Sequence, residues 1–170
     1  MSDTDKLFNS TVTHYTAIES GDIHHYPGDD ELMTISASFA MHFGLMRLGI
    51  HHERLMPGRR LSWPHAEADE EEFIYVIEGT PDLWLDGHIR PLKPGDGVGF
   101  PAGTGLAHTF INNTKSDVRL LVVGEASRMR SRIHYPLHSK RNAELKELHW
   151  KDVPHRSLGT HDGKPKAKRS

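Results

Sequence analysis

The sequence has no cysteine and no long apolar run. Without cysteine there can be no disulfides, thiolate metal sites or cysteine nucleophiles, so histidine and carboxylate side chains are the available metal ligands. No run approaches the roughly 20 apolar residues that span a bilayer, and the polar start MSDTDKLFNS has no signal-peptide pattern. These absences predict a cytoplasmic protein with no membrane partner.

An excess of charge of one sign is also missing. The 21 Lys+Arg and 23 Asp+Glu residues give a formal net charge of −2. There is therefore no overall positive field to attract a nucleic acid, and we expect no such partner. The basic residues near the C-terminus are interpreted as solvated: Lys164, Lys166, Lys168 and Arg169.

The length of 170 residues suits one domain. Composition divides the chain into a polar N-terminal arm (1–40), a β-rich barrel region (41–126), an extension with one strand and one helix (127–153) and a tail (154–170). The helix is expected within Ser139–His149, where Leu145 and Leu148 have helical spacing. The tail has few apolar residues to offset its ordering entropy, so we expect it to be mobile.

Short apolar runs separated by Gly, Pro and Asp predict an all-β fold. The Asp86-Gly87 pair between two such runs indicates a tight hairpin, because Gly accepts the positive φ that the turn requires. Strands this short and evenly spaced are typical of a sandwich or jelly-roll barrel. The expected strands are Thr34–Phe39, Phe43–Met56, Leu61–Ala66, Glu72–Glu78, Asp82–Leu85, Ile89–Leu92, Val98–Phe100, Thr109–Ile111 and Val118–Val123.

Four side chains form a candidate metal site. His65 and Glu67 are two residues apart, so on a strand both leave the same face and can share one ion. Glu72 opens the apolar run that follows and can point back to the same place. His108 follows a Gly-rich turn and begins another apolar run.

The spacing of these residues resembles the two motifs of the cupin superfamily. The first motif, Gly-x5-His-x-His-x(3,4)-Glu-x6-Gly, is similar to the segment His65-x-Glu67-x4-Glu72-x6-Gly79. The second motif, Gly-x5-Pro-x-Gly-x2-His-x3-Asn, is similar to the segment from Gly95 to Asn112, which carries His108. The resemblance covers Leu45–Val123 and is to small single-domain bacterial cupins of unassigned role. It implies a double-stranded β-helix, or jelly roll, with one divalent metal ion in the barrel mouth.

The chain departs from the cupin pattern in three places. Glu67 stands where the family has its second His, four residues instead of two separate Gly103 from His108, and the first His is shifted by one relative to Gly58. Two histidines and two carboxylates around a divalent ion sum to roughly zero charge, which shifts preference towards harder ions. Zn, Mn, Fe and Ni all remain possible. Glu67 is either a ligand or a group that transfers protons.

Strand parity predicts which side chains line the metal cavity. Trp63 shares a face with His65, Ile74 with Glu72, and Phe110 with His108. We place Phe100 in the same lining set, although all four aromatic and aliphatic residues are equally compatible with ordinary barrel core. One of His51 and His52 must face inward, and we expect His51 either to contact the metal ligands or to be a satisfied core histidine.

Three functions are compatible with this pattern. The first is a metal-dependent enzyme acting on a small polar, carboxylate or sugar-like molecule; cupins include dioxygenases, decarboxylases, isomerases, epimerases and lyases, so the resemblance leaves the reaction open. The second is a metal-containing module that binds or senses a small molecule without turnover. The third is a structural jelly roll. An open metal site with an aromatic-lined cavity favours the enzyme.

A barrel of this size leaves one or two strand edges open, and small β domains often protect such edges by pairing with another chain. We therefore expect a homodimer in which the arm around Ile23–Phe39 adds a strand across the two-fold axis.

Overall fold

The computed structural model describes residues 2–126 and 131–166. Residues 127–130, at the start of the expected extension, and 167–170, at the end of the expected tail, lie outside the described residues. Ten strands make up most of the body: β1 (Ile35–Ser38), β2 (Leu48–Leu55), β3 (Ala66–Glu67), β4 (Glu72–Glu78), β5 (Asp82–Leu85), β6 (His88–Pro91), β7 (Gly97–Phe100), β8 (His108–Ile111), β9 (Val118–Glu125) and β10 (Ile133–His134).

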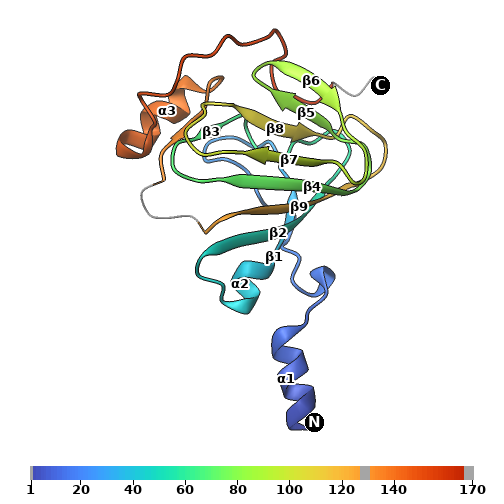
Figure 1. Ribbon diagram of the computed structural model, residues 1–170. Coiled ribbons are helices and arrows are strands. Elements are labelled where there is room, and N and C mark those ends of the chain that lie inside the picture. Colours follow the sequence, from blue (N-terminus) through green and yellow to red (C-terminus); the bar gives the residue numbers. More distant parts are fainter. Residues whose placement is uncertain (1, 127–130, 167–170) are drawn as a thin grey trace.

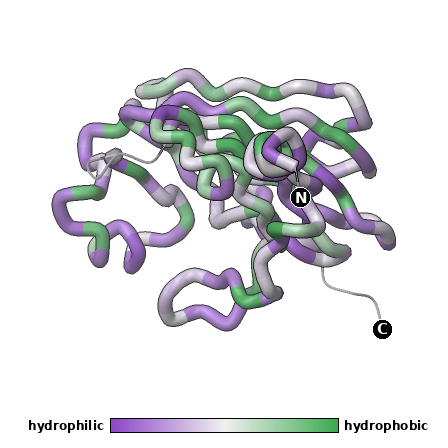
Figure 2. The backbone as a smooth tube through the Cα atoms, turned by 90° about the horizontal axis from the view of Figure 1, so that it is seen from below, coloured by the Kyte–Doolittle hydropathy of each residue, from purple (hydrophilic) through white to green (hydrophobic). Residues whose placement is uncertain are grey.

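Antiparallel sheets build the barrel, which confirms the all-β prediction. The larger sheet has the order β1-β2-β9-β4-β7, the second has the order β6-β5-β8, and β10 pairs with β3 (Figure 1). β4 and β5 have the bounds that the sequence pattern predicts, and most of the others shift by a few residues. Of the expected strand Leu61–Ala66, only Ala66 lies in a strand, β3, because residues 61–64 form bends and His65 makes an isolated bridge. The core between the sheets consists of alternate strand residues: Leu55, Ile74, Val76, Leu83, Leu92, Phe100, Phe110, Val118 and Leu120. Hydrophilic segments gather in the outlying turns and loops (Figure 2).

The hairpin between β5 and β6 turns at Asp86 and Gly87, as the sequence predicts. Both residues have positive φ, 44° and 82°. A side chain at Gly87 would place its Cβ 2.5 Å from the backbone of Gly159, so this position also needs glycine for close approach.

Two helices of the N-terminal region were not expected from the sequence. α1 (Asp3–Thr11) begins with a capping box, in which Ser2 and Asp5 exchange hydrogen bonds between side chain and backbone. This helix projects away from the barrel (Figure 1). α2 (Phe39–Phe43) begins at the Ser38 cap and ends at Gly44, inside the run expected to be a strand. One 3₁₀ turn, Tyr15–Ala17, lies between α1 and β1.

The C-terminal helix lies where it was expected. α3 (Ser139–Leu145) is followed by a 3₁₀ turn at Lys146–Leu148, so the helical segment spans most of the predicted range. The described residues contain no helix that is long and apolar enough to cross a membrane.

The arm pairs with its own barrel. β1 forms the edge of the larger sheet beside β2, with Ile35 opposite Arg54 and Ser38 opposite His51. Its strand is thus already used within the chain, and the homodimer stays a prediction that does not depend on exchanging this strand.

Residues 154–166, which we name the C-terminal strap, pack across the second sheet. The strap donates backbone hydrogen bonds from Gly159 to Asp86 O (2.7 Å) and from His161 to Gly87 O (3.1 Å). The backbone carbonyl of His161, also in the strap, accepts a hydrogen bond from the Trp84 indole N–H (2.9 Å). The expectation of a tail without anchoring contacts does not describe these residues. That expectation considered only apolar burial, whereas backbone polar groups hold the strap.

Arg60 ties the strap to the arm. Its side chain is 1% exposed and donates to both carboxylate oxygens of Glu31 (2.8 and 2.5 Å) and to Gly163 O (2.9 Å). One buried guanidinium therefore joins segments that are 29 residues before it and 103 residues after it in the chain.

Candidate metal-binding site in the barrel

Two histidines face each other at the mouth of the barrel. His65 and His108 exchange backbone hydrogen bonds, His65 N to His108 O (3.2 Å) and His108 N to His65 O (2.9 Å). Directly opposed residues on antiparallel strands carry their side chains on the same face. The two rings accordingly lie 5.0 Å apart between centroids.

Backbone carbonyls orient both rings. The Nδ1 atom of His65 lies 2.8 Å from Trp63 O, and that of His108 lies 3.1 Å from Leu106 O. A carbonyl oxygen can only accept, so Nδ1 must carry the proton in each ring. In His65 the neutral form leaves a lone pair on Nε2, whereas Nε2 of His108 faces a carboxylate oxygen of Glu72 and donates to it. Metal-binding histidines are commonly held in this way, with one nitrogen donating and the other free for an ion.

Glu72 contacts the Nε2 atom of His108. Its Oε2 lies 2.9 Å from His108 Nε2, and β4 positions it by pairing with Phe100 of β7 and Gly124 of β9. Burial alone would raise the pKa of Glu72, but the hydrogen bond and charge of His108, aided by His65 and His51, hold the pKa below its ordinary value. Glu72 is therefore a carboxylate at neutral pH.

His65 is neutral at the same pH. Burial, together with the charge of the neighbouring His108, lowers its pKa to about 4, although Glu72 opposes the shift. A neutral imidazole is the form that binds metal ions.

Glu67 is the second carboxyl group of the predicted site. It lies on β3, whose partner β10 pairs Ile133 with Glu67. Burial, with the negative charges of Glu72 and Glu70, raises the pKa of Glu67 to about 8. This carboxyl group is thus poised to gain or lose a proton near neutral pH, which suits proton transfer.

The donor set can be tested against the metal that the cupin resemblance implies. Two imidazole nitrogens and one carboxylate oxygen are ligands of the right chemical type, and two of the three groups, His108 and Glu72, are in direct contact. In the region that the structure describes, however, no group of three or more His, Cys, Asp or Glu side chains is arranged to hold an ion as it stands. The Glu72 Oε2 atom lies beside His108 Nε2, where an ion bound to this nitrogen would lie. The residues fit the metal in chemistry and orientation, and binding would replace this hydrogen bond.

The predicted lining residues divide into two groups. Phe100 stacks on His108 with centroids 3.5 Å apart, and Ile74 and Phe110 belong to the buried core beside it. His51 faces inward on β2, where its Nδ1 lies 3.3 Å from Ser36 Oγ. Trp63 lies elsewhere: its ring is stacked between Tyr26 and His138, in a separate cluster outside the main core. Trp63 contributes to the site through its backbone carbonyl, which accepts a hydrogen bond from His65 Nδ1, and not through its ring.

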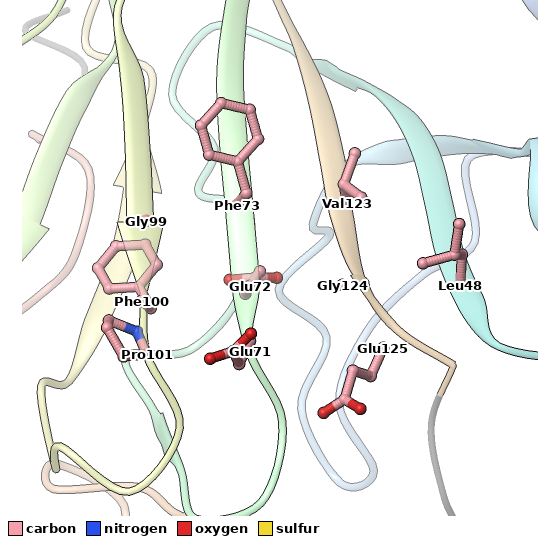
Figure 3. A pocket seen from close by; sticks show the side chains of 10 residues that line it. All are labelled: Leu48, Glu71, Glu72, Phe73, Gly99, Phe100, Pro101, Val123, Gly124 and Glu125. Carbon is pink, nitrogen blue, oxygen red and sulfur yellow. The ribbon is translucent and has the colours of Figure 1, made fainter.

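A pocket of about 420 Å³ opens beside Glu72 and Phe100 at the end of the larger sheet. Figure 3 shows Phe73 and Val123 on neighbouring strands, with the carboxylates of Glu71 and Glu125 towards the lower end of the view. Glu72 and Phe100 line this pocket, but neither His65 nor His108 is among its lining residues.

Sequence reasoning missed Glu53. This residue faces inward on β2, is 7% exposed and has a carboxyl oxygen, Oε2, with no hydrogen-bond partner among the described residues. Strand parity with His51 could have indicated it, since residues two apart on a strand share a face.

Comparison with known proteins identifies the barrel. Residues 51–124 match the Cupin_2 family model, described as a cupin domain. The chain carries a cupin domain. The matched segment contains all four predicted metal-site residues: His65, Glu67, Glu72 and His108.

Relatives of this cupin differ in their described activities. Polyketide synthase CurC of Streptomyces cyaneus is 35% identical over 78 residues, which is 46% of this chain and 46% of CurC. A sugar phosphate isomerase of the cupin superfamily from Silicibacter pomeroyi is 34% identical, with a TM-score of 0.57, over 60% of this chain and 64% of that one. The chain thus spans less than two thirds of each.

The polyketide cyclase RemF of Streptomyces resistomycificus is similar over more of its length. It is 25% identical, with a TM-score of 0.59, over 81% of this chain and 96% of RemF. Structural similarity to RemF therefore extends beyond the segment that matches the family model.

Proposed function

We propose that this cupin is an enzyme that transfers a proton at a carbon atom next to a carbonyl group, in a small uncharged molecule rich in oxygen. The observation that carries the proposal is the contact of His108 Nε2 with Glu72 (2.9 Å) beside the ring of His65, with Glu67 close enough for its pKa to be raised by Glu72. A proton acceptor beside a group that can bind a carbonyl oxygen is what such a reaction requires.

Three residues would hold one divalent cation, Zn, Mn, Fe or Ni: His65, Glu72 and His108. When bound, the cation would act as a Lewis acid that polarises a carbonyl group. The backbone carbonyls of Trp63 and Leu106 keep the two rings oriented for this role.

Glu67 is the proposed base. In its ionised form it removes a proton from the carbon beside the carbonyl; the electron pair of the C–H bond forms the enolate double bond, and the negative charge moves to the carbonyl oxygen. Protonated Glu67 then returns the proton to carbon. A group whose pKa is about 8 can both accept and donate near neutral pH.

The electrostatics of the site favour an uncharged substrate. The charged groups that act on Glu72 are histidines, while those that act on Glu67 are other carboxylates. A phosphate dianion would meet a like charge at Glu72, and also at Glu53 and Glu67 in the fraction of molecules in which these two groups are ionised. This argument favours a polyketide-like ketone over a sugar phosphate.

The relatives support this reaction class. The names of two structural relatives are sugar phosphate isomerase and polyketide cyclase. Isomerisation between an aldose and a ketose, and aldol closure of a polyketone, both begin with loss of a proton beside a carbonyl group. For the present chain we propose only this shared proton-transfer step, and not the substrate of either relative.

The test is hydrogen exchange in D₂O followed by NMR. We expect the protein with added Zn²⁺ to exchange the acetyl protons of 2′,4′-dihydroxyacetophenone faster than the C1 protons of D-fructose 6-phosphate. Glu67→Gln should slow exchange by about 100-fold or more, the usual contribution of a general base. Glu78→Gln, a control on an exposed carboxylate at the far end of β4, should leave the rate unchanged. Absence of exchange with both compounds would refute the enzymatic proposal.

A non-catalytic binding module is the second candidate. It is favoured by the His108–Glu72 hydrogen bond, which occupies the position of an ion in the described site. Binding of the acetophenone without proton exchange would support this function instead.

A further inference from the structure

A second group of polar side chains lies inside the barrel on β1 and β2. Ser36 Oγ donates to Glu53 Oε1 (2.8 Å) and lies 3.3 Å from His51 Nδ1. Ser36 and Glu53 are opposite each other in the register of the two strands. We name Ser36, His51 and Glu53 the β1–β2 polar cluster; none of them belongs to the predicted metal ligands.

Glu53 occupies a position that its surroundings would make apolar. On the same face of β2 the next inward residue is Leu55, and the residue opposite Glu53 on β9 is Leu120; both belong to the core. The Ser36 hydroxyl satisfies one carboxyl oxygen, but Oε2 is buried with no hydrogen-bond partner among the described residues. Thr34 also acts on the Glu53 carboxyl group, but its hydroxyl donates to Arg54 O (3.0 Å). Buried polar atoms are nearly always paired in native proteins, so Oε2 requires a partner beyond those that the described residues supply.

The cluster and the histidine site share the interior of the larger sheet. Glu72 lies opposite Gly124 on β9, and Gly124 lies opposite Gly49 on β2. Two successive positions beside Glu72 therefore carry no side chain on the inner face. The span from β4 to β2 is two strand spacings, roughly 10 Å, which is the size of a small molecule. The charge of Glu72 also contributes to raising the pKa of Glu53, after burial, as expected if both face one interior.

We propose that the β1–β2 polar cluster is a second subsite, which binds a hydroxyl group of the same molecule whose carbonyl end lies at His65, Glu72 and His108. A hydroxyl suits Glu53 Oε2 in either protonation state, because it can donate to a carboxylate or accept from a carboxylic acid. Ser36 acts as a positioning residue that fixes the other oxygen. The ligand class is a small carbonyl compound with a hydroxyl group at its far end. This inference rests on the proposed function.

A pair of probes that differ by one hydroxyl group tests the subsite. 2′,4′-Dihydroxyacetophenone has the far hydroxyl, and 2′-hydroxyacetophenone lacks it. We expect the Zn²⁺-loaded wild-type protein to bind the first about tenfold more tightly, the size of one hydrogen bond. Glu53→Leu should bind both equally, and Ser36→Ala should lose part of the preference.

Thermal unfolding of the variants separates binding from folding. Because Leu fits among Leu55 and Leu120, Glu53→Leu should keep or raise the Tm of the wild type. Glu53→Gln, which retains the size and a hydrogen-bonding end, should keep part of the preference and serves if the leucine variant fails to fold.

Each outcome decides between the two proposals. An unchanged tenfold preference in Glu53→Leu, or no preference in the wild type, would overturn the subsite and assign a water molecule to Oε2, while proton exchange could still confirm the proposed function. If the wild type neither binds nor exchanges either compound, the proposed function fails and the subsite fails with it.

Discussion

Replacement of Arg60 by methionine tests how the strap and the arm are held to the barrel. Met keeps the apolar length of the side chain but removes the guanidinium, which donates to two oxygens of Glu31 and to Gly163 O. Net contributions are about 1.5–3 kcal/mol for a hydrogen bond to a charged group and about 1 kcal/mol for a neutral one.

The expected loss is about 3 kcal/mol. Breaking a fully buried ion pair costs about 3–5 kcal/mol, but the Glu31 side chain is 28% exposed and can regain water. We assign about 2 kcal/mol to the Glu31 pair and about 1 kcal/mol to the Gly163 bond. For a chain of this length, a loss of about 3 kcal/mol corresponds to a Tm lower by about 6–12 °C.

The neighbouring Arg59 provides a matched control. It makes a similar two-pronged contact with Asp22 of the same arm, but the Asp22 side chain is 40% exposed. Arg59→Met should cost under about 1 kcal/mol for the exposed pair and about 1 kcal/mol for the bond to Met33 O (3.2 Å), which is less in total than Arg60→Met. Both variants can be compared by calorimetry and by limited proteolysis, in which Arg60→Met should release the strap for cleavage. Equal Tm values for the two variants would refute the assignment of Arg60 as the anchor.

Four further predictions follow from the site and the sheets. Burial raises the pKa of Glu53 to about 7 from an ordinary value of 4.5; the folded state then binds more protons between these values, so stability should fall as pH rises through this range, and urea unfolding of Glu53→Gln should show a weaker pH dependence. His108→Ala should lose Zn²⁺ affinity by about 100-fold or more in calorimetric titration, whereas Glu67→Ala should lose under about tenfold if Glu67 is a base and much more if it is a ligand. Gly87→Ala would place a Cβ 2.5 Å from the strap backbone, so its Tm should fall and its strap should become sensitive to protease; an unchanged Tm would contradict the close packing. Phe73 is 45% exposed on the outer face of β4, and we expect a homodimer through this face, so light scattering should show a dimer that Phe73→Glu converts to a monomer; a wild-type monomer would exclude it.

The barrel strands could be read from the sequence because alternation and turns act locally. The pattern over Glu72–Glu78 and the Asp86-Gly87 turn each depends on neighbouring residues alone, and the structure confirms both. The α2 helix was missed because its Phe39–Phe43 segment is apolar in either structure, and the Ser38 cap and Gly44 end decide the outcome. Short apolar runs give no periodicity that separates helix from strand.

The site could be predicted only in part. Motif spacing selected His65, Glu72 and His108, and the structure brings His65 beside His108 and Glu72 against His108. The position of the Trp63 ring could not be predicted, because contacts with Tyr26 and His138, far away in sequence, override strand parity. Glu53 needed the register of β1, β2 and β9, which sequence spacing does not contain.

The Arg60 anchor has a consequence for the order of events during synthesis. Its partner carbonyl at Gly163 lies 103 residues further along the chain, and ribosomes add about 5–20 residues per second. For roughly 5–20 seconds after residue 60 is made, the guanidinium can reach Glu31 but not the strap. During this interval the nascent barrel also lacks the acceptor for the Trp84 indole, so a chaperone or protease could distinguish an unfinished chain from a completed one by whether the second sheet is still uncovered.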